Sequence, residues 1–153
     1  MKKLFVLLVI MIAVSEINAQ SSLRAKHFNL DKKGLAIQGY DPVAYFAQSK
    51  AQKGNAKFQF TYEGAVYLFS SQNNLDTFKQ NPQKYEPQYG GWCAYAMGAS
   101  GEKVEVDPET FKIVNGKLYL FYHSWINNTL LKWNDDESHL LPNADKNWKN
   151  ILK

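Results

Sequence analysis

The feature of this sequence that most constrains its fold is a hairpin signal in the second half of the chain. Two apolar-rich runs, residues 111–114 and 117–122, flank the pair Asn115–Gly116. Asparagine and glycine best tolerate the positive φ that both positions of a two-residue hairpin turn require. The sequence therefore predicts two antiparallel strands joined at this pair.

A second hairpin is predicted earlier in the chain by alternation. Phe58, Phe60 and Tyr62 alternate with polar residues, which is the two-residue period of a half-buried strand. The pair Glu63–Gly64 supplies a tight turn, and apolar residues then alternate again up to position 69. We therefore expect a hairpin over residues 57–70.

Short helices are expected around these hairpins. Asp41 followed by Pro42 is typical of a capped helix start, and Ser70 or Ser71 can cap a helix that ends at Asn81. Further helical segments are expected at 92–97, after Ser124 with Trp125, Leu130 and Trp133 on the apolar side, and after Asn143 with Trp148, Ile151 and Leu152. Two hairpins among several short helices predict a single α+β domain over residues 36–153, built on a small antiparallel sheet.

The first twenty residues predict export from the cytoplasm. Lys2 and Lys3 precede an apolar run of eleven residues, 4–14, and Ala19 offers a cleavage point before Gln20. A bilayer span needs about 20 apolar residues, so a signal peptide over residues 1–19 is favoured over an uncleaved anchor. We expect a periplasmic or secreted protein without a membrane span after cleavage, and a polar N-terminal leader over residues 20–35.

Charge and cysteine content narrow the function classes. The net charge is +4, or +3 once the signal peptide is removed, and the basic residues are scattered without runs. This pattern disfavours nucleic acid as a partner. Cys93 is the only cysteine, so an internal disulfide is excluded. A lone thiol in an exported protein is expected to be buried, ligated, reactive or paired with another chain, and burial is the commonest case.

Several spaced motifs resemble a known family. They are Asp41–Pro42–Val43, Tyr62-x-Gly64-x-x-Tyr67-x-Phe69, and Phe78-x-x-x-Pro82-x-x-Tyr85. This order resembles the YHS domain, and the later motifs Tyr89–Ala96, Val106–Pro108 and Gly116–Leu120 resemble its longer, exported branch, over about residues 36–150. The resemblance implies kinship with small cysteine-rich modules that bind metals.

The same resemblance implies where the metal ligands of the family would fall. The positions are Ala44, Ser70 and Asn74, so none of the expected thiolates is present. Soft transition metals are held by anionic sulfur or by imidazole, and a methyl group, a hydroxyl and an amide are poor substitutes. We expect the inherited metal site to be lost.

The remaining candidate site surrounds Cys93. Gly90–Gly91 permits a tight turn, and the next segment would place Cys93 in the first turn of a helix, where free amide groups favour the thiolate. Met97 lies on the same helical face, and His123 ends the later hairpin. A Cys–Met–His set would suit copper or another transition-metal ion. The competing interpretation is that Cys93 and Met97 simply face the core.

Other residues are candidates for lining a ligand site beside Cys93. They are Tyr40, Asp41, Tyr95 and Asp107. Each Asp–Pro pair is also explained by helix capping alone. The sequence does not show whether these groups converge.

Three functions fit these residues. The first is a non-catalytic binding module for a metal ion or a small ligand, with Cys93 at or near its site. The second is a thiol-dependent enzyme or redox protein with Cys93 as nucleophile and His123 as base, although no second cysteine could resolve an oxidised thiol. The third is a structural or interaction role, because aromatic residues form 14% of the chain and some are expected to be exposed. We expect the binding module, with no defined ligand or protein partner.

Overall fold

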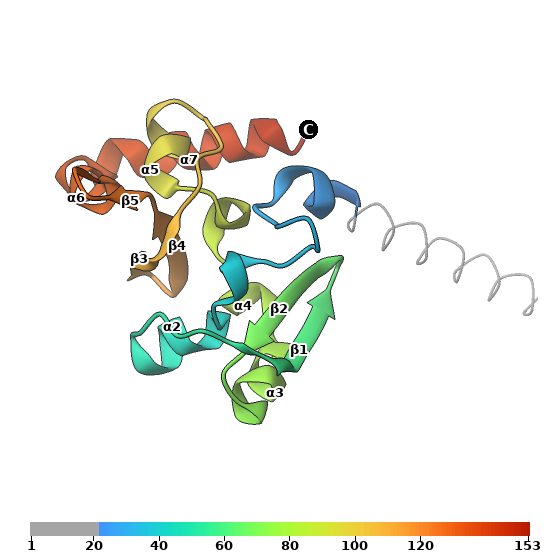
Figure 1. The fold of residues 1–153 in the computed structure, drawn as a ribbon. Helices are drawn as coiled ribbons and strands as arrows, with labels where there is room; N and C mark the ends of the chain where they lie inside the picture. The colour runs from blue at the N-terminus through green and yellow to red at the C-terminus, as the bar shows by residue number, and fades with distance from the viewer. Residues whose placement is uncertain (1–21) are drawn as a thin grey trace, which may run out of the picture.

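The computed structural model describes residues 22–153, so the predicted signal peptide and its cleavage point lie outside the described residues. Helices alternate with short antiparallel hairpins along the chain, which confirms the predicted α+β class (Figure 1). Between residues 22 and 153 no helix has both the length and the apolar character that a bilayer span requires.

Both predicted hairpins are present. Strand β1 (Asn55–Tyr62) pairs with β2 (Ala65–Phe69), and β3 (Asp107–Val114) pairs with β4 (Lys117–Phe121). The turns are the predicted pairs, and all four turn residues have positive φ: 45° at Glu63, 86° at Gly64, 51° at Asn115 and 72° at Gly116. Local turn chemistry was therefore sufficient to place these strands.

The two hairpins do not join into one sheet, contrary to our expectation. Each is a separate two-stranded sheet. The reason lies at their edges, which irregular segments of the chain already occupy. Leu35 forms a bridge with Val66 of β2, and Pro87 forms one with Leu118 of β4. Each hairpin thus pairs at one point with an irregular segment and not with the other hairpin.

The helices of the first half begin where the sequence predicts. Helix α2 (Pro42–Gln48) is capped by Asp41, whose Oδ1 accepts hydrogen bonds from the amides of Val43 and Ala44 at 2.9 and 3.3 Å. Helix α3 (Gln72–Gln80) is capped by Ser71. The short η1 (Ile37–Gly39) and α4 (Pro82–Tyr85) complete this half.

The helices of the second half differ from the prediction at three starts, since α5 begins after Cys93 and not at residue 92. Segments η2 (Gln88–Gly91) and α5 (Ala94–Ala99) precede β3. Helix α6 (Thr129–Asp135) begins at cap Asn128, not at Ser124, because Ser124 pairs with Asn127 in a third hairpin, β5 (His123–Ser124) with β6 (Asn127–Asn128). Helix α7 (Glu137–Ile151) already contains Asn143, so the cap predicted there was wrong.

Strand β4 lies between two apolar clusters. Successive residues of a strand point to opposite faces. Leu118 and Leu120 belong to a cluster formed largely by the first half of the chain, while Tyr119 and Phe121 belong to one with Trp133 and the buried side of α7. Because one strand serves both clusters, the two halves of the chain form a single body.

The N-terminal segment is more closely attached than a leader lying on the surface. Residues 22–27 are helical, and Arg24 is only 4% exposed. Its guanidinium forms ion pairs with Glu86 and with Glu63, the latter at 2.7 Å, and Tyr67 Oη donates a 2.5 Å hydrogen bond to Glu86. A buried charge needs such partners. This network ties the segment to the β1–β2 turn and to the end of α4.

Candidate functional site

The positions implied as metal ligands by the resemblance do meet in space, around Asp41. We call Asp41, Ser70 and Asn74 the Asp41 cluster. Asp41 Oδ2 accepts hydrogen bonds from Ser70 N at 2.8 Å, Ser70 Oγ at 2.7 Å and Asn74 Nδ2 at 2.6 Å. Its Oδ1 caps α2, which carries Ala44. Asp41 is 0% exposed, so every partner it has comes from the chain itself.

This arrangement does not fit a transition metal. The carboxylate already accepts five hydrogen bonds, and the groups around it are donors. A soft metal ion would need anionic sulfur or imidazole where the chain has alanine, serine and asparagine. Within residues 22–153 no three His, Cys, Asp or Glu side chains are arranged to hold a metal ion. The Asp41 cluster therefore acts as a structural tie between α2 and α3.

Cys93 is buried in the core with partners for its sulfur. The residue is 0% exposed and occupies the cap position of α5 rather than its first turn. The amide of Tyr122 donates to Sγ at 3.3 Å, and Thr129 Oγ1 lies 3.4 Å from Sγ. Thr129 Oγ1 also donates to the Tyr122 carbonyl at 2.7 Å. The thiol thus connects α5 to Tyr122, the residue after β4, and to the start of α6.

The other residues of the Cys–Met–His set lie in different surroundings. Met97 is 0% exposed and belongs to the cluster with Trp133, whereas Cys93 belongs to the cluster with Tyr45. His123 is exposed, and its Nδ1 lies 3.1 Å from Thr110 Oγ1 and 3.4 Å from Asp107 Oδ2. The imidazole is thus held by a hydroxyl and a carboxylate, and the sulfur of Cys93 by an amide and a different hydroxyl.

The remaining sequence candidates have partners away from the thiol. Tyr40 Oη donates to Glu109 Oε1 at 2.9 Å, and burial together with this carboxylate raises the pKa of Tyr40. Asp107 accepts hydrogen bonds from the Glu109 amide at 3.0 Å and from Thr110 Oγ1 at 2.9 Å, as a turn-capping residue does. Tyr95 lies under the ammonium group of Lys132, 5.8 Å from the ring centre.

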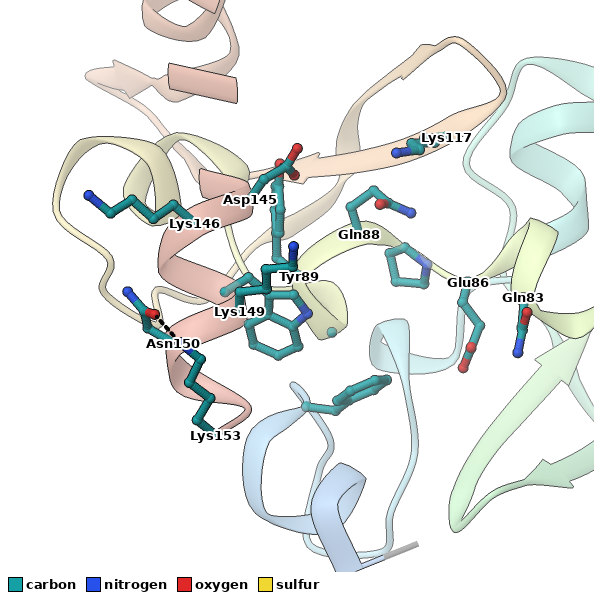
Figure 2. A pocket seen from close by; sticks show the side chains of 14 residues that line it. Gln83, Glu86, Gln88, Tyr89, Lys117, Asp145, Lys146, Lys149, Asn150 and Lys153 are labelled. Carbon is teal, nitrogen blue, oxygen red and sulfur yellow. Dashed lines mark hydrogen bonds between the residues drawn. The ribbon is translucent and has the colours of Figure 1, made fainter. Parts of the chain in front are cut away.

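A pocket that the sequence did not indicate lies where the N-terminal segment, residues 83–90 of α4 and η2, and α7 meet (Figure 2). We call it the α7 pocket; its volume is about 730 Å³. Figure 2 shows Lys117 on one side of it and Lys146, Lys149 and Lys153 along α7 on the other. The lining residues are Phe28, Gln83, Glu86, Pro87, Gln88, Tyr89, Gly90, Lys117, Asp145, Lys146, Trp148, Lys149, Asn150 and Lys153.

The aromatic part of this pocket depends on a tight turn at Tyr89–Gly90. Both residues have positive φ, 56° and 60°, which is uncommon for tyrosine. A Cβ on Gly90 would lie 2.9 Å from carbon atoms of both Phe28 and Trp148, so only glycine lets these rings close over the turn. Tyr89 Oη donates to Asp145 Oδ1 at 2.9 Å, and burial, with this carboxylate, raises the pKa of Tyr89.

The charges around the α7 pocket leave a positive excess. Both carboxylates have internal partners, since Glu86 pairs with Arg24 and Asp145 accepts from Tyr89. Lys153 donates to Asn150 Oδ1 at 3.3 Å. Among residues 22–153, no carboxylate forms an ion pair with the remaining lysines of the lining. These are Lys117, Lys146 and Lys149.

One sequence signal could have pointed to this pocket. Residues 146, 149 and 153 are spaced three and four apart, so their lysines share one face of a helix. The basic residues form no contiguous run, so this spacing is visible only at the period of a helix. The aromatic part had no such signal, since Phe28, Tyr89 and Trp148 come from three distant segments.

The comparison with protein families agrees with the motifs of the first half. Residues 43–89 match the family model described as YHS domain. No curated protein and no solved structure matched the chain. The matched segment runs from α2 to the turn that forms the edge of the α7 pocket, so the pocket lies between this segment and elements outside it. The match confirms, for residues 43–89, the resemblance to the YHS domain that the motifs from Asp41 to Tyr85 predicted.

Proposed function

We propose that this protein is an exported, non-catalytic binding module that holds a small anionic ligand with a planar ring in the α7 pocket. The ligand would lie between the last residues of the YHS domain and α7. Its ring would contact the aromatic side chains, and its anionic group would face the lysines.

The observation that carries this proposal is the composition of the α7 pocket. A volume of about 730 Å³ is in the usual range for small-molecule sites, which combine apolar walls with a few polar groups. Phe28 and Trp148, both only partly buried, supply aromatic surface, and the buried Tyr89 lies beneath them in the turn. Lysines without carboxylate partners supply positive charge, as described above. A flat anionic molecule would satisfy both.

The geometry around Cys93 argues against a thiol-dependent reaction, and equally against a ligand site at this thiol. A nucleophilic thiol needs access to substrate and a base within hydrogen-bond reach. Cys93 is 0% exposed, and the atoms near its sulfur are an amide nitrogen and a threonine hydroxyl. His123, the base considered from the sequence, instead faces Thr110 and Asp107.

Calorimetric titration with three probes tests the proposal. Naphthalene-2-sulfonate has both a ring and a charge, 2-naphthol has the ring alone, and inorganic phosphate has the charge alone. We expect measurable binding of naphthalene-2-sulfonate, and binding of the other two at least about tenfold weaker, because each lacks one set of contacts. At a hundredfold excess over its dissociation constant, the bound probe should stabilise the fold by about 2.7 kcal/mol.

Matched lysine variants locate the site. Lys146→Gln/Lys149→Gln removes two charges at the α7 pocket, and Lys32→Gln/Lys33→Gln removes two exposed charges elsewhere. The first pair should weaken naphthalene-2-sulfonate binding by about five- to tenfold, and the second should change it little. Equal effects of the two pairs, or no binding of any probe, would contradict the proposal.

A further inference from the structure

The third hairpin differs from the other two in its turn residues. Glu63–Gly64 and Asn115–Gly116 have positive φ, as two-residue turns usually require. The β5–β6 turn is instead Trp125–Ile126, and neither residue has positive φ. Trp125 is 100% exposed and Ile126 is 91% exposed. We had placed Trp125 on the buried side of a helix, which was wrong. Neither turn chemistry nor core packing accounts for these two side chains.

The base of this hairpin is firmly attached to the core. The amide and the hydroxyl of Thr129 both donate to the Tyr122 carbonyl, at 3.1 and 2.7 Å. His123 pairs with Asn128 in the short ladder above this base. Thr129 is itself buried, beside the sulfur of Cys93. The two apolar side chains are therefore held out into solvent by an ordered support. Strand β5, which leads into this turn, lies beside α6 at the edge of the ribbon (Figure 1).

The chain segment that carries the tip is uncharged. Residues 124–131 contain no Asp, Glu, Lys or Arg, and Leu131 within this run is 60% exposed. The first charged residue after the tip is Lys132, and the acidic residues 135–137 follow only at the far end of α6. The tip is thus a small apolar projection on a chain with a net charge of +4, or +3 once the predicted signal peptide is removed.

The size of this projection argues against a protein partner. A stable protein interface buries about 800 Å² on each partner, whereas one tryptophan offers only about 150–250 Å². Trp125, Ile126 and Leu131 together remain well below that requirement. A lipid surface has no such threshold, because the interfacial layer of a bilayer takes up single indole rings, with their polar N–H, and adjacent aliphatic side chains.

We propose that the Trp125–Ile126 turn inserts into the interfacial layer of a lipid bilayer and docks the folded protein on its surface. The net positive charge adds attraction to anionic headgroups. This docking involves a different part of the molecule from the α7 pocket and does not depend on what that pocket binds.

Co-sedimentation of the purified protein with vesicles tests the docking. One set of vesicles is phosphatidylcholine and the other is phosphatidylcholine mixed with phosphatidylglycerol. We expect binding to both, stronger to the anionic set. Trp125→Ser/Ile126→Ser should reduce the partition coefficient at least about tenfold, because it removes the apolar area that inserts. Its melting temperature should match that of wild type, since side chains this exposed contribute little to packing.

Two further variants keep this test specific. Asn115→Ser changes the β3–β4 turn instead and should bind vesicles as wild type does. Trp125→Phe/Ile126→Leu keeps an apolar tip and should retain most binding, but brominated lipids should quench much less of its tryptophan fluorescence than in wild type. Failure of wild type to sediment with either vesicle, or undiminished binding by the serine variant, would overturn the proposal. So would a dimer in sedimentation equilibrium that the serine variant abolishes.

Discussion

The Asp41 cluster and the α7 pocket differ in how their charged groups are partnered. Around Asp41, a carboxylate is surrounded by five donors from the chain and is sealed from solvent. Along α7, Lys146 and Lys149 are exposed, and their charges are not neutralised by a neighbouring carboxylate.

The difference separates stability from ligand binding. A polar group whose partners are all internal contributes to the fold, and removing it leaves buried donors unsatisfied. A charged group facing a solvent-filled pocket contributes little to the fold and is available for a ligand. By this criterion Ser70 and Asn74, two of the positions that the resemblance implied as metal ligands, hold the fold together through Asp41, and the α7 pocket is the site to test for binding.

The largest effect is expected from Asp41→Ala. This change leaves the donors of Ser70 and Asn74 without their acceptor and removes the cap of α2. We expect a loss of about 3–5 kcal/mol in the free energy of unfolding, because each unsatisfied buried donor costs about 1–3 kcal/mol. Urea denaturation measures it. Asp76→Ala, an exposed aspartate on α3, is the control and should cost less than about 0.5 kcal/mol. A cost below about 1 kcal/mol for Asp41→Ala would contradict the structural role of the cluster.

The next effect concerns the turn under the α7 pocket. Gly90→Ala combines a positive φ of 60° with contacts of 2.9 Å to Phe28 and Trp148. Gly116→Ala has a similar φ of 72°, but nothing lies within 4 Å of the added Cβ. We expect about 2–3 kcal/mol for the first and about 1 kcal/mol for the second, because only the first adds a steric clash. Thermal unfolding of both variants compares them, and equal costs would show that the rings do not constrain Gly90.

A smaller effect is expected at Cys93. Cys93→Ala should cost about 1–2 kcal/mol through lost packing. In the native protein the thiol should react with iodoacetamide far more slowly than in urea, because it is 0% exposed. Any change in melting temperature on adding copper or zinc should be the same for wild type and for Cys93→Ala, because the thiol is not expected to bind the metal. Rapid alkylation of the native thiol, or a metal-induced shift that Cys93→Ala abolishes, would restore the thiol site that we considered from the sequence.

The sequence predicted what local chemistry decides and missed what distant segments decide. The turns at Glu63–Gly64 and Asn115–Gly116 and the cap at Asp41 each depend on a few adjacent residues, and all three were correct. Trp125 was misplaced because an apolar residue at helical spacing is normally buried, and periodicity does not reveal a residue exposed for another reason. The α7 pocket brings Phe28 to Trp148 across most of the chain, and no local pattern encodes that contact.

The smallest effect is the dependence of ligand affinity on ionic strength. It compares the exposed charges of the α7 pocket with the buried charge of the Asp41 cluster without any mutation of the pocket. Raising sodium chloride from about 0.1 M to about 1 M shortens the Debye length from about 10 to about 3 Å, which screens exposed charges far more than buried ones. The affinity for naphthalene-2-sulfonate should fall by about two- to fivefold, because the lysines of the α7 pocket face solvent. Any binding of 2-naphthol should not weaken, since its ring makes no charge contact. The loss in free energy of unfolding caused by Asp41→Ala should also stay constant, because the carboxylate and its five hydrogen bonds are buried and are little screened by salt. If salt instead left the sulfonate affinity unchanged, the lysines would not be its partners, and ring contacts alone would account for binding.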